Sequence, residues 1–179
     1  MAEERRKRLL LTTLIVGATG CGCFMVLALG TIVAAILLPV FNQAREKART
    51  AQCLTHLKQL ALATAQYAAD YGTLPPARYW TVALSPYLAS PSVFLCPSAR
   101  QLECGYAFYQ PVGGRQLKSI QQPSTTPLLF DSSRGLRNHA DKGESIAFRH
   151  SNGACIAFVD GHVRRLPAAK ATKVFLPKQ

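Results

Sequence analysis

The sequence predicts an α+β protein in which one long N-terminal helix packs on a small antiparallel β-sheet. First, the residues from Leu9 to Leu38 carry no charge and follow directly on a basic cluster at 5–8. Second, residues 39–72 repeat apolar side chains at the spacing of one helix face. Third, residues 145–166 contain short apolar runs separated by turn residues, the pattern of a β-meander.

The uncharged run at 9–38 predicts a transmembrane helix. At ~1.5 Å per residue it would be about 45 Å long, more than the ~30 Å hydrocarbon core of a bilayer. Cleaved secretory signals have apolar regions of only about 7–15 residues, so a retained anchor is favoured. The basic leader at 1–8 favours a cytoplasmic N-terminus. We therefore expect a single-pass protein of the cytoplasmic (inner) membrane, in contact with the lipid bilayer, with an extracytoplasmic C-terminal domain.

Residues 39–72 predict an amphipathic continuation of the same helix. No Gly or Pro interrupts the stretch between Pro39 and Gly72, and alanine is abundant, so helix propensity agrees with the pattern. Gly72 stands where a C-terminal cap ends a helix, and Pro75 and Pro76 prevent its continuation. The positions expected on the buried face are Leu54, Leu57, Leu60, Ala61, Thr64, Ala68 and Tyr71.

The globular head at 73–179 is predicted to begin with a loop-rich region. A short helix at 79–88 and a short strand at 127–130 are expected within it, and the polar stretch 131–143 is expected to form a surface excursion. The C-terminal meander is predicted as three antiparallel strands at 145–150, 154–159 and 162–166.

The first turn of this meander sets its expected register. A three-residue loop at 151–153, with its glycine at positive φ, would place His150 opposite Ala154. A two-residue Asn-Gly loop would scatter the large apolar side chains over both faces, so the longer loop is favoured.

The second turn, Asp160-Gly161, is predicted as a two-residue type I′ turn that places Val163 opposite Phe158. In this register the large apolar residues of the meander share one face, namely Ile146, Phe148, Ile156, Phe158 and Val163. We expect that face to pack on the amphipathic half of the helix.

Composition limits the classes of function. The chain carries 21 Lys and Arg against 9 Asp and Glu, a formal net charge of +12 at pH 7. The basic residues are scattered and no nucleic-acid signature accompanies them, so nucleic acid is not an expected partner. No Gly-x-Ser-x-Gly elbow, His-Glu-x-x-His helix or phosphate-binding glycine loop occurs, so the sequence does not predict an enzyme. The alternative to a structural role is a tethered binding module with a basic head for a polyanion, an envelope glycan or DNA.

Four of the six cysteines lie outside the uncharged run: Cys53, Cys96, Cys104 and Cys155. An even number of cysteines in a segment expected outside the cytoplasm predicts two disulfides, for which three pairings are open. A zinc site is the competing interpretation, and it is disfavoured because no Cys-x2-Cys pair occurs in this segment. No metal ligand is therefore expected.

Residues 32–166 resemble a known family. The segment AAILLPVFNQAREKARTAQCLTHLKQLALATAQYAADYGTLPP is similar to the first helix of prepilin-like proteins related to the major pseudopilin of type II secretion. The end of the chain is similar to a subgroup with a His-x9-Asp-Gly motif, here His150, Asp160 and Gly161. The resemblance implies a pilin-like fold and a structural subunit of a type II secretion or type IV pilus-like system. Its partners would be other pilin-like subunits, bound through the N-terminal helix.

The resemblance also implies a processing site. Counting back from Pro39 in the family's spacing places cleavage by a prepilin peptidase between Gly17 and Ala18. Gly22 stands where the family usually carries a glutamate. An alternative for this stretch is a lipoprotein box in which Cys21 would be lipid-modified.

Further residue roles follow from the same resemblance. It implies a Cys53–Cys96 disulfide, with Cys104–Cys155 as the second bridge and Cys96–Cys104 as the rival pair. Some pseudopilins hold calcium in a C-terminal loop, which makes Asp131, Asp141 and Glu144 candidate ligands, although their spacing is not that of a dense calcium loop. Otherwise no cofactor is expected.

The His-x9-Asp-Gly motif itself is predicted to be structural. The expected register separates His150 from Asp160 by roughly 20 Å, so the two are not expected to share a metal ion. His150 is predicted to be a strand-end residue whose ring closes the core and whose nitrogen meets a loop carbonyl or solvent.

Overall fold

The computed structural model describes residues 2–176, without the side chains of residues 2, 7, 9–29 and 32. The chain divides into two compact units, one up to residue 45 and one from residue 46 onward. Helix α1 (Ala2–Tyr71) contains the described part of the first unit and begins the second. The other elements are α2 (Trp80–Leu84), η1 (Ser85–Tyr87), η2 (Pro91–Phe94), β1 (Tyr106–Tyr109), η3 (Gln110–Val112), η4 (Leu117–Ser119), β2 (Pro127–Asp131), β3 (Ala140–Asp141), β4 (Gly153–Phe158), β5 (Val163–Pro167) and α3 (Ala168–Val174).

The structure corrects the prediction of a transmembrane helix at 9–38. Within the part of the chain that the structure describes, no helix is long and apolar enough to cross a membrane. The side chains at 9–29 lie outside the described residues.

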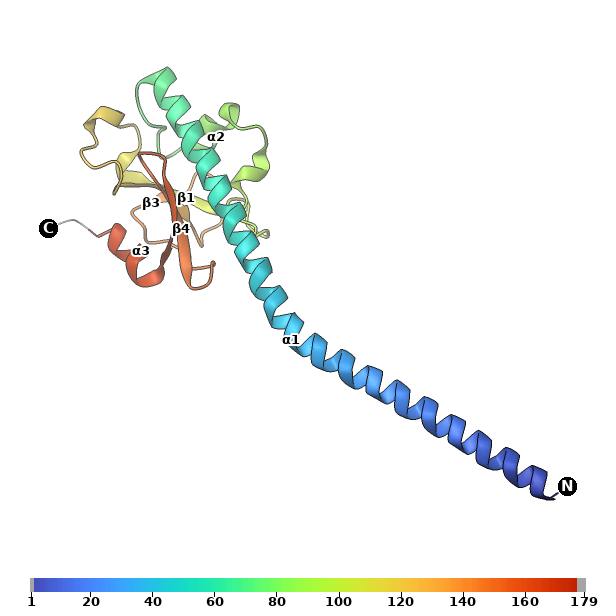
Figure 1. Ribbon diagram of the computed structural model, residues 1–179. Helices are drawn as coiled ribbons and strands as arrows, with labels where there is room; N and C mark the ends of the chain where they lie inside the picture. Colours follow the sequence, from blue (N-terminus) through green and yellow to red (C-terminus); the bar gives the residue numbers. More distant parts are fainter. Residues whose placement is uncertain (1, 177–179) are drawn as a thin grey trace. The chain divides into compact units, whose positions relative to one another are not determined.

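The amphipathic half of α1 is confirmed. Its segment in the second unit lies across one face of the sheet (Figure 1). Five of the seven predicted positions are fully buried: Leu57, Leu60, Ala61, Thr64 and Ala68. Leu54 is half-buried, whereas Tyr71 is 65% exposed because it lies in the last turn, beyond the edge of the core. The predicted end is also confirmed, since Gly72 has φ +74° and donates its N–H to the carbonyl of Ala68.

The sheet has five strands in the order β3-β1-β2-β4-β5. The pairs β1–β2, β2–β4 and β4–β5 are antiparallel, whereas β1 and β3 are parallel, and of these pairings only β4–β5 was predicted. The fold is therefore a mixed α/β arrangement in which β1, β3 and the C-terminal helix α3 were not predicted. The predicted strand at 127–130 and helix at 79–88 are present as β2 and as α2 followed by η1.

Both faces of the sheet are covered, by α1 on one side and α3 on the other (Figure 1). The face toward α1 carries Cys155 and Ala157 from β4, and the face toward α3 carries Ile156 and Phe158. The large apolar residues of the C-terminal region, Ile146, Phe148, Ile156 and Phe158, thus pack with α3, and only Val163 packs with the α1 core. The prediction that this whole set packs on the long helix is wrong.

The first strand of the predicted meander is also wrong. Residues 145–150 form no strand, and only Ile146 makes a bridge, to Ser132. The reason is that β2 occupies that edge of β4, with Phe130 opposite Ile156. Ser151 and Asn152 have φ of 50° and 58°, which makes a two-residue turn in which His150 exchanges both backbone hydrogen bonds with Gly153 rather than facing Ala154.

The second turn is one residue longer than predicted. Val163 pairs with Ala157 instead of Phe158. Phe158 lies opposite His162 and donates its N–H to the carbonyl of that residue, so three residues, 159–161, form the turn. Gly161 alone has a positive φ, of 85°, so the turn is not type I′. Asp160 stabilises it by accepting the backbone N–H of His162 at 3.0 Å.

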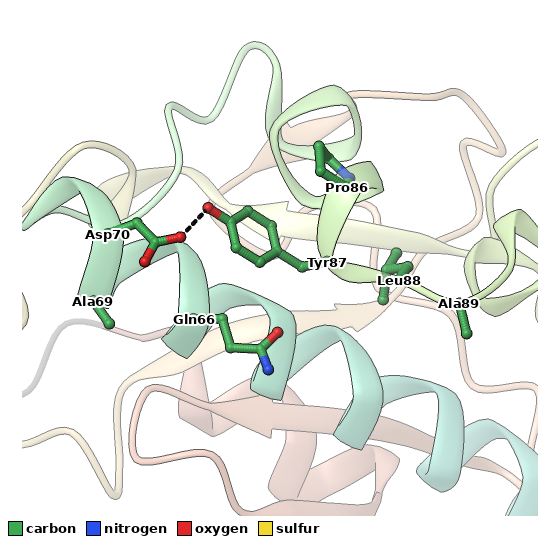
Figure 2. A pocket seen from close by; sticks show the side chains of 7 residues that line it. All are labelled: Gln66, Ala69, Asp70, Pro86, Tyr87, Leu88 and Ala89. Carbon is green, nitrogen blue, oxygen red and sulfur yellow. Dashed lines mark hydrogen bonds between the residues drawn. The ribbon is translucent and has the colours of Figure 1, made fainter.

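A shallow hollow of about 600 Å³ lies between the last turns of α1 and the segment after α2 (Figure 2). Across it, the hydroxyl of Tyr87 donates to the carboxylate of Asp70 at 2.6 Å. This hydrogen bond raises the pKa of the Tyr87 phenol to about 12, since the carboxylate disfavours the phenolate. The contact fastens η1 to α1 and brings no other titratable group into the hollow.

We predict that Leu60→Ala costs about 2–5 kcal/mol of unfolding free energy, because Leu60 is fully buried between α1 and the sheet. The matched control is Leu62→Ala on the same helix, where the side chain is 52% exposed and the change should be within about 0.5 kcal/mol. Denaturant unfolding of both variants of the full chain measures the difference. Equal losses would mean that α1 does not pack on the sheet by this face.

Candidate metal centre

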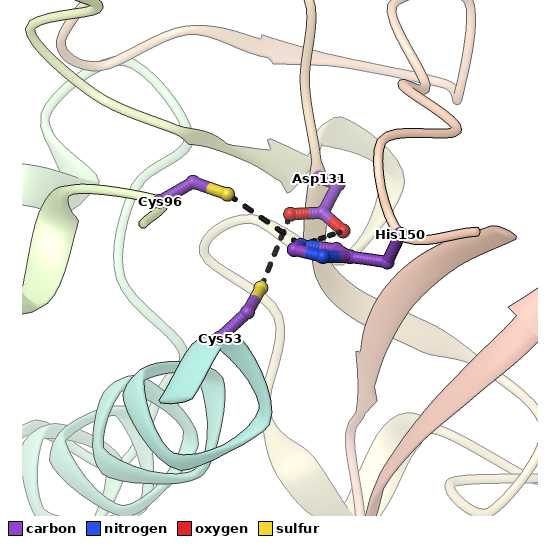
Figure 3. A group of neighbouring side chains, drawn as sticks. All are labelled: Cys53, Cys96, Asp131 and His150. Atoms are coloured by element: carbon purple, nitrogen blue, oxygen red, sulfur yellow. Dashed lines mark hydrogen bonds and ion pairs between the residues drawn. The ribbon is translucent and has the colours of Figure 1, made fainter. Parts of the chain in front are cut away.

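Four polar side chains from distant parts of the sequence converge beneath α1: Cys53, Cys96, Asp131 and His150 (Figure 3). All four residues are fully buried. One potential ligand atom of each lies within 4.8 Å of the corresponding atom of the other three. Among the described residues this is the one such group of His, Cys, Asp or Glu side chains.

Helix α1 supplies its part of the site through its repeat. Glu46, Thr50 and Cys53 follow one another at spacings of four and three residues, so they lie on the stripe that continues into Leu57. The sheet supplies Asp131, the last residue of β2, whose register partner on β1 is Tyr106. The side chains of these two strand residues share the face that meets α1.

Cys96 follows the short helix η2, and its position is fixed by a close backbone contact. Gly105 donates its N–H to the carbonyl of Phe94 at 2.8 Å. A Cβ at Gly105 would lie 2.4 Å from the Cβ of Cys96, so no side chain fits there. The position of His150 is likewise fixed by backbone contacts, because His150 and Gly153 exchange two backbone hydrogen bonds across the tight turn between them.

Within the site, each side chain meets at least one other. The thiol of Cys53 donates to Oδ1 of Asp131 at 3.3 Å. The Sγ of Cys96 lies 3.5 Å from Nε2 of His150, and the same nitrogen lies 3.7 Å from Oδ2 of Asp131. Sulfur, nitrogen and oxygen donors therefore face a common centre.

A second layer of groups holds these four. Nδ1 of His150 lies 3.2 Å from Oε1 of Glu46 and 3.4 Å from the hydroxyl of Thr50. Because a carboxylate only accepts, Nδ1 carries a proton, and this bond directs Nε2 toward the site. Oδ2 of Asp131 accepts the backbone N–H of Cys155 at 2.7 Å.

Arg149 balances charge at the edge of the site. Its guanidinium lies 3.7 Å from Oδ1 of Asp131. It also donates to the carbonyls of Ser132 and Gly105, at 2.9 and 2.7 Å, so it links the backbone that carries Asp131 to the backbone that positions Cys96. On the other side, the hydroxyl of Tyr106 donates to Sγ of Cys53 at 3.4 Å.

Burial governs the protonation of the acids in the site. Burial raises the pKa of Asp131, and the opposing effects of His150, the Cys155 N–H and Arg149 do not fully offset it. The Cys155 thiol beside Cys53 raises the pKa of Cys53, and the Cys53 thiol together with burial raises that of Cys96. Burial lowers the pKa of His150, but its bond to Cys96 and the negative charge of Asp131 outweigh this and raise it.

The contacts of Cys96, His150 and Glu46 follow the order of a nucleophile, a base and an orienting carboxylate. Two observations argue against that chemistry. Cys96 has no exposed surface, and its thiol pKa is raised, whereas a nucleophilic cysteine has a lowered pKa and is accessible. The site is thus better suited to binding than to nucleophilic catalysis.

A surface hollow of about 300 Å³ adjoins the site. Its lining includes Cys96, Pro97, His56 and Gln52. Nδ1 of His56 lies 2.9 Å from the carbonyl of Leu95, which joins α1 to the wall of the hollow. The hollow ends against Cys96, whose own surface is buried.

The four cysteines predicted to form disulfides are free thiols in the structure. Cys53 and Cys96, the first predicted pair, are neighbours within the site. Cys104 instead donates to the carbonyl of Tyr106 at 3.3 Å, and burial raises the pKa of its thiol to about 11. Cys155, on β4, lies beside Cys53 of α1. The disulfides Cys53–Cys96 and Cys104–Cys155 stay predictions for an oxidised chain.

The candidate calcium ligands do not form one group. Asp131 belongs to the buried site, and β1 separates it from Asp141, since the two face Tyr106 and Tyr109 respectively. Asp141 accepts from His139 at 2.8 Å and from the backbone of Gly143, while Glu144 accepts the N–H of Lys142. The prediction that 131–143 is a surface excursion is wrong at Asp131, which is fully buried.

The family motif is divided by the fold. His150 lies in the buried site, and its partners are a thiol and two carboxylates rather than the predicted loop carbonyl or solvent. Asp160 and Gly161 form the β4–β5 turn, where Asp160 accepts from the ring of His162 at 2.6 Å. The candidate processing residues Gly17 and Ala18 lie in the part of α1 whose side chains are not described, as do Cys21 and Gly22.

Sequence reasoning singled out every member of the site but did not assemble them. It assigned Cys53 and Cys96 to a disulfide, Asp131 to a loop and His150 to packing. The available signal was Asp131 itself, a charged residue directly after the apolar run Leu128–Phe130 of a central strand. A carboxylate in that position is buried and needs partners.

A family described as "Protein of unknown function (DUF1559)" has a model that matches residues 42–88. The match covers the α1 segment that carries Glu46, Thr50 and Cys53, and it extends through α2 and η1. It is loosely consistent with a prepilin-like protein and does not reach the His-x9-Asp-Gly motif. No curated protein and no solved structure matches the chain.

We predict that Gly105→Ala lowers the unfolding free energy by about 1–3 kcal/mol, because the added methyl overlaps the backbone and Cβ of Cys96. Gly30→Ala is the matched control, since no atom lies within 4 Å of a Cβ there and helix propensity improves. Thermal and denaturant unfolding of both variants provides the comparison. A neutral Gly105→Ala would contradict the close approach.

A pH-dependent effect is expected at Asp141. Burial raises its pKa, but hydrogen bonds from Ser145, Gly143 and His139 outweigh burial and lower it below the usual 3.8. A lowered carboxyl pKa stabilises the fold above the unfolded pKa, and this stability is lost as pH falls through the folded value. Asp141→Asn should therefore lower the melting temperature at pH 7, and the gap to the parent protein should close below about pH 4. Exposed Glu103→Gln serves as control, and a gap independent of pH would refute the assignment.

Proposed function

We propose that this protein is a pilin-like structural subunit of a type II secretion or type IV pilus-like system, which acts by assembly with other pilin-like subunits. The observation that carries the proposal is the uncovered apolar surface of the first unit. Its exposed apolar side chains, with exposed fractions of 48–67%, are Val33, Ile36, Leu37, Leu38, Val40 and Phe41.

All nine residues at 33–41 are apolar and they make more than two turns of α1, so apolar side chains lie on every side of the helix. A helix that is apolar all round is stable only when it is covered on all sides. One flat partner surface covers one side, whereas several parallel copies of the same helix cover every side. An assembly in which like helices form the centre therefore suits this segment.

The second unit suits the role of a head in such an assembly. Its part of α1 is fixed to the sheet by the buried face at 53–68 and by the polar site below it. The match at residues 42–88 and the His150…Asp160-Gly161 spacing give further support.

The net charge of +12 supports a second candidate, a binding module for a polyanion. The two functions differ in their dependence on salt. Binding to a polyanion weakens steeply as ionic strength rises, since counterions are released on binding. Association through apolar helices is not weakened by salt.

The expected result for the assembly role is that Leu37→Ser combined with Phe41→Ser reduces self-association, as measured by analytical ultracentrifugation over a range of salt concentrations. Val82→Ser combined with Leu136→Ser is the matched control, because these side chains are 63% and 57% exposed but lie in the second unit, whereas Leu37 is 58% exposed. The control should associate like the parent protein. Equal effects of both pairs, or dissociation of the parent protein by salt alone, would refute assembly through α1.

A further inference from the structure

We propose that Cys53, Cys96, Asp131 and His150 bind a zinc ion in a four-coordinate site that joins α1 to the head. Nothing in the proposed assembly role requires this site, so the two proposals stand or fall separately. The inference rests on the donor set, the spacing of the donor atoms and the groups that hold them.

Three separations between the side chains of the site match the edges of a zinc tetrahedron, and one ligand atom of each residue lies within 4.8 Å of the others. Zinc binds Cys sulfur at ~2.3 Å and His nitrogen or carboxylate oxygen at ~2.0–2.2 Å, which places neighbouring ligand atoms ~3.3–3.8 Å apart. The separations in the site are 3.3 Å for Cys53 Sγ to Asp131 Oδ1, 3.5 Å for Cys96 Sγ to His150 Nε2, and 3.7 Å for His150 Nε2 to Asp131 Oδ2. Because ligand atoms up to 4.8 Å apart exceed the ~3.8 Å edge of such a tetrahedron, the side chains would draw together around the ion.

The donor set selects the metal. Two sulfurs, one imidazole and one carboxylate match the mixed ligands that Zn²⁺ accepts in tetrahedral geometry. Mg²⁺ and Ca²⁺ require six or more oxygen ligands, which this site does not offer. On binding, the two thiol protons pass to solvent, and the sulfurs ligate as thiolates.

Charge also favours a divalent cation. Two thiolates and the carboxylate of Asp131 would carry three negative charges in a fully buried site. Zn²⁺ neutralises two of them, and the guanidinium of Arg149, 3.7 Å from Asp131, neutralises the third.

The orientation of His150 provides an independent indication. Metal-binding histidines usually donate their second ring nitrogen to a carboxylate or carbonyl, which fixes the ring and raises its basicity. Nδ1 of His150 makes this bond to Glu46 at 3.2 Å, so Nε2 faces the two sulfurs and Asp131. Likewise, Oδ2 of Asp131 is held by the Cys155 N–H and Cys53 by the hydroxyl of Tyr106.

Four protein ligands close the coordination sphere, which is the arrangement of structural zinc sites rather than catalytic ones. The ligands come from α1, the segment after η2, the end of β2 and the turn before β4. The hollow that Cys96 lines adjoins one of the four ligands, although all four are buried in this structure.

The test uses the full-length protein, purified under reducing conditions, stripped with a chelator and reloaded with ZnCl₂. We expect one zinc per chain by inductively coupled plasma mass spectrometry after gel filtration. Cys96→Ser should lose the metal. Cys104→Ser should retain it, because Cys104 is an equally buried cysteine outside the site.

Glu46→Gln separates an effect on zinc binding from an effect on folding, because Glu46 is partly exposed and is not one of the four ligands. We expect this variant to fold normally by circular dichroism and to bind zinc about 10–100-fold more weakly, measured by competition with a chromophoric chelator. Cobalt(II) in place of zinc should give thiolate-to-metal charge-transfer absorption in the parent protein and in Cys104→Ser.

Three results would overturn the proposal. One is a folded, reduced parent protein that takes up no zinc or shows no thiolate–cobalt band. Another is loss of zinc from Cys104→Ser to the same extent as from Cys96→Ser. The third is a Cys53–Cys96 disulfide, found by peptide mapping of protein from its native host, since that bond would use both sulfurs.

Discussion

The carboxylate of Asp131 is the constraint on which the second unit depends. It lies fully buried between the sheet and α1, where an unpaired charge is costly. Its surroundings supply a backbone N–H from Cys155, the guanidinium of Arg149, the ring of His150 and the thiol of Cys53. These groups come from α1, from the adjacent residues Arg149 and His150, and from β4, so satisfying one carboxylate fixes β2 against all three.

The need to bring Cys53 of α1 close to Asp131 explains why the residues of β4 that face α1 are small. Cys155 and Ala157 on β4 allow the helix to approach the sheet closely enough for Cys53 to reach Asp131. The larger Ile156 and Phe158 point to the opposite face, where α3 covers them together with Phe130 and Phe175. On β4, small residues therefore face the helix and bulky residues face α3, whereas β1 and β2 contribute bulky apolar side chains such as Phe108 and Leu129 to the face toward α1.

The two units present different solutions to the burial of a helix. From Glu46 onward, α1 has a defined inner face that ends in the polar site, and its outer face mixes polar side chains with alanines and with exposed Leu62 and Tyr71. In the described part before Arg45, apolar side chains surround the helix and remain exposed. The first arrangement is complete within one chain, whereas the second leaves apolar surface for contacts beyond it.

The sequence by itself determined the elements whose signal is local. Helical spacing predicted the buried stripe from Leu57 to Ala68, Gly72 predicted the end of α1, and short apolar runs beside turn residues predicted β2 and β4. Only the tertiary structure decided which strands pair and which face meets the helix, because a shift of one residue in a turn inverts every side chain. The pairing of β2 with β4 displaced the predicted strand at 145–150. It also brought together Cys53, Cys96, Asp131 and His150, whose proximity depends on contacts across nearly a hundred residues and leaves no periodic pattern to detect.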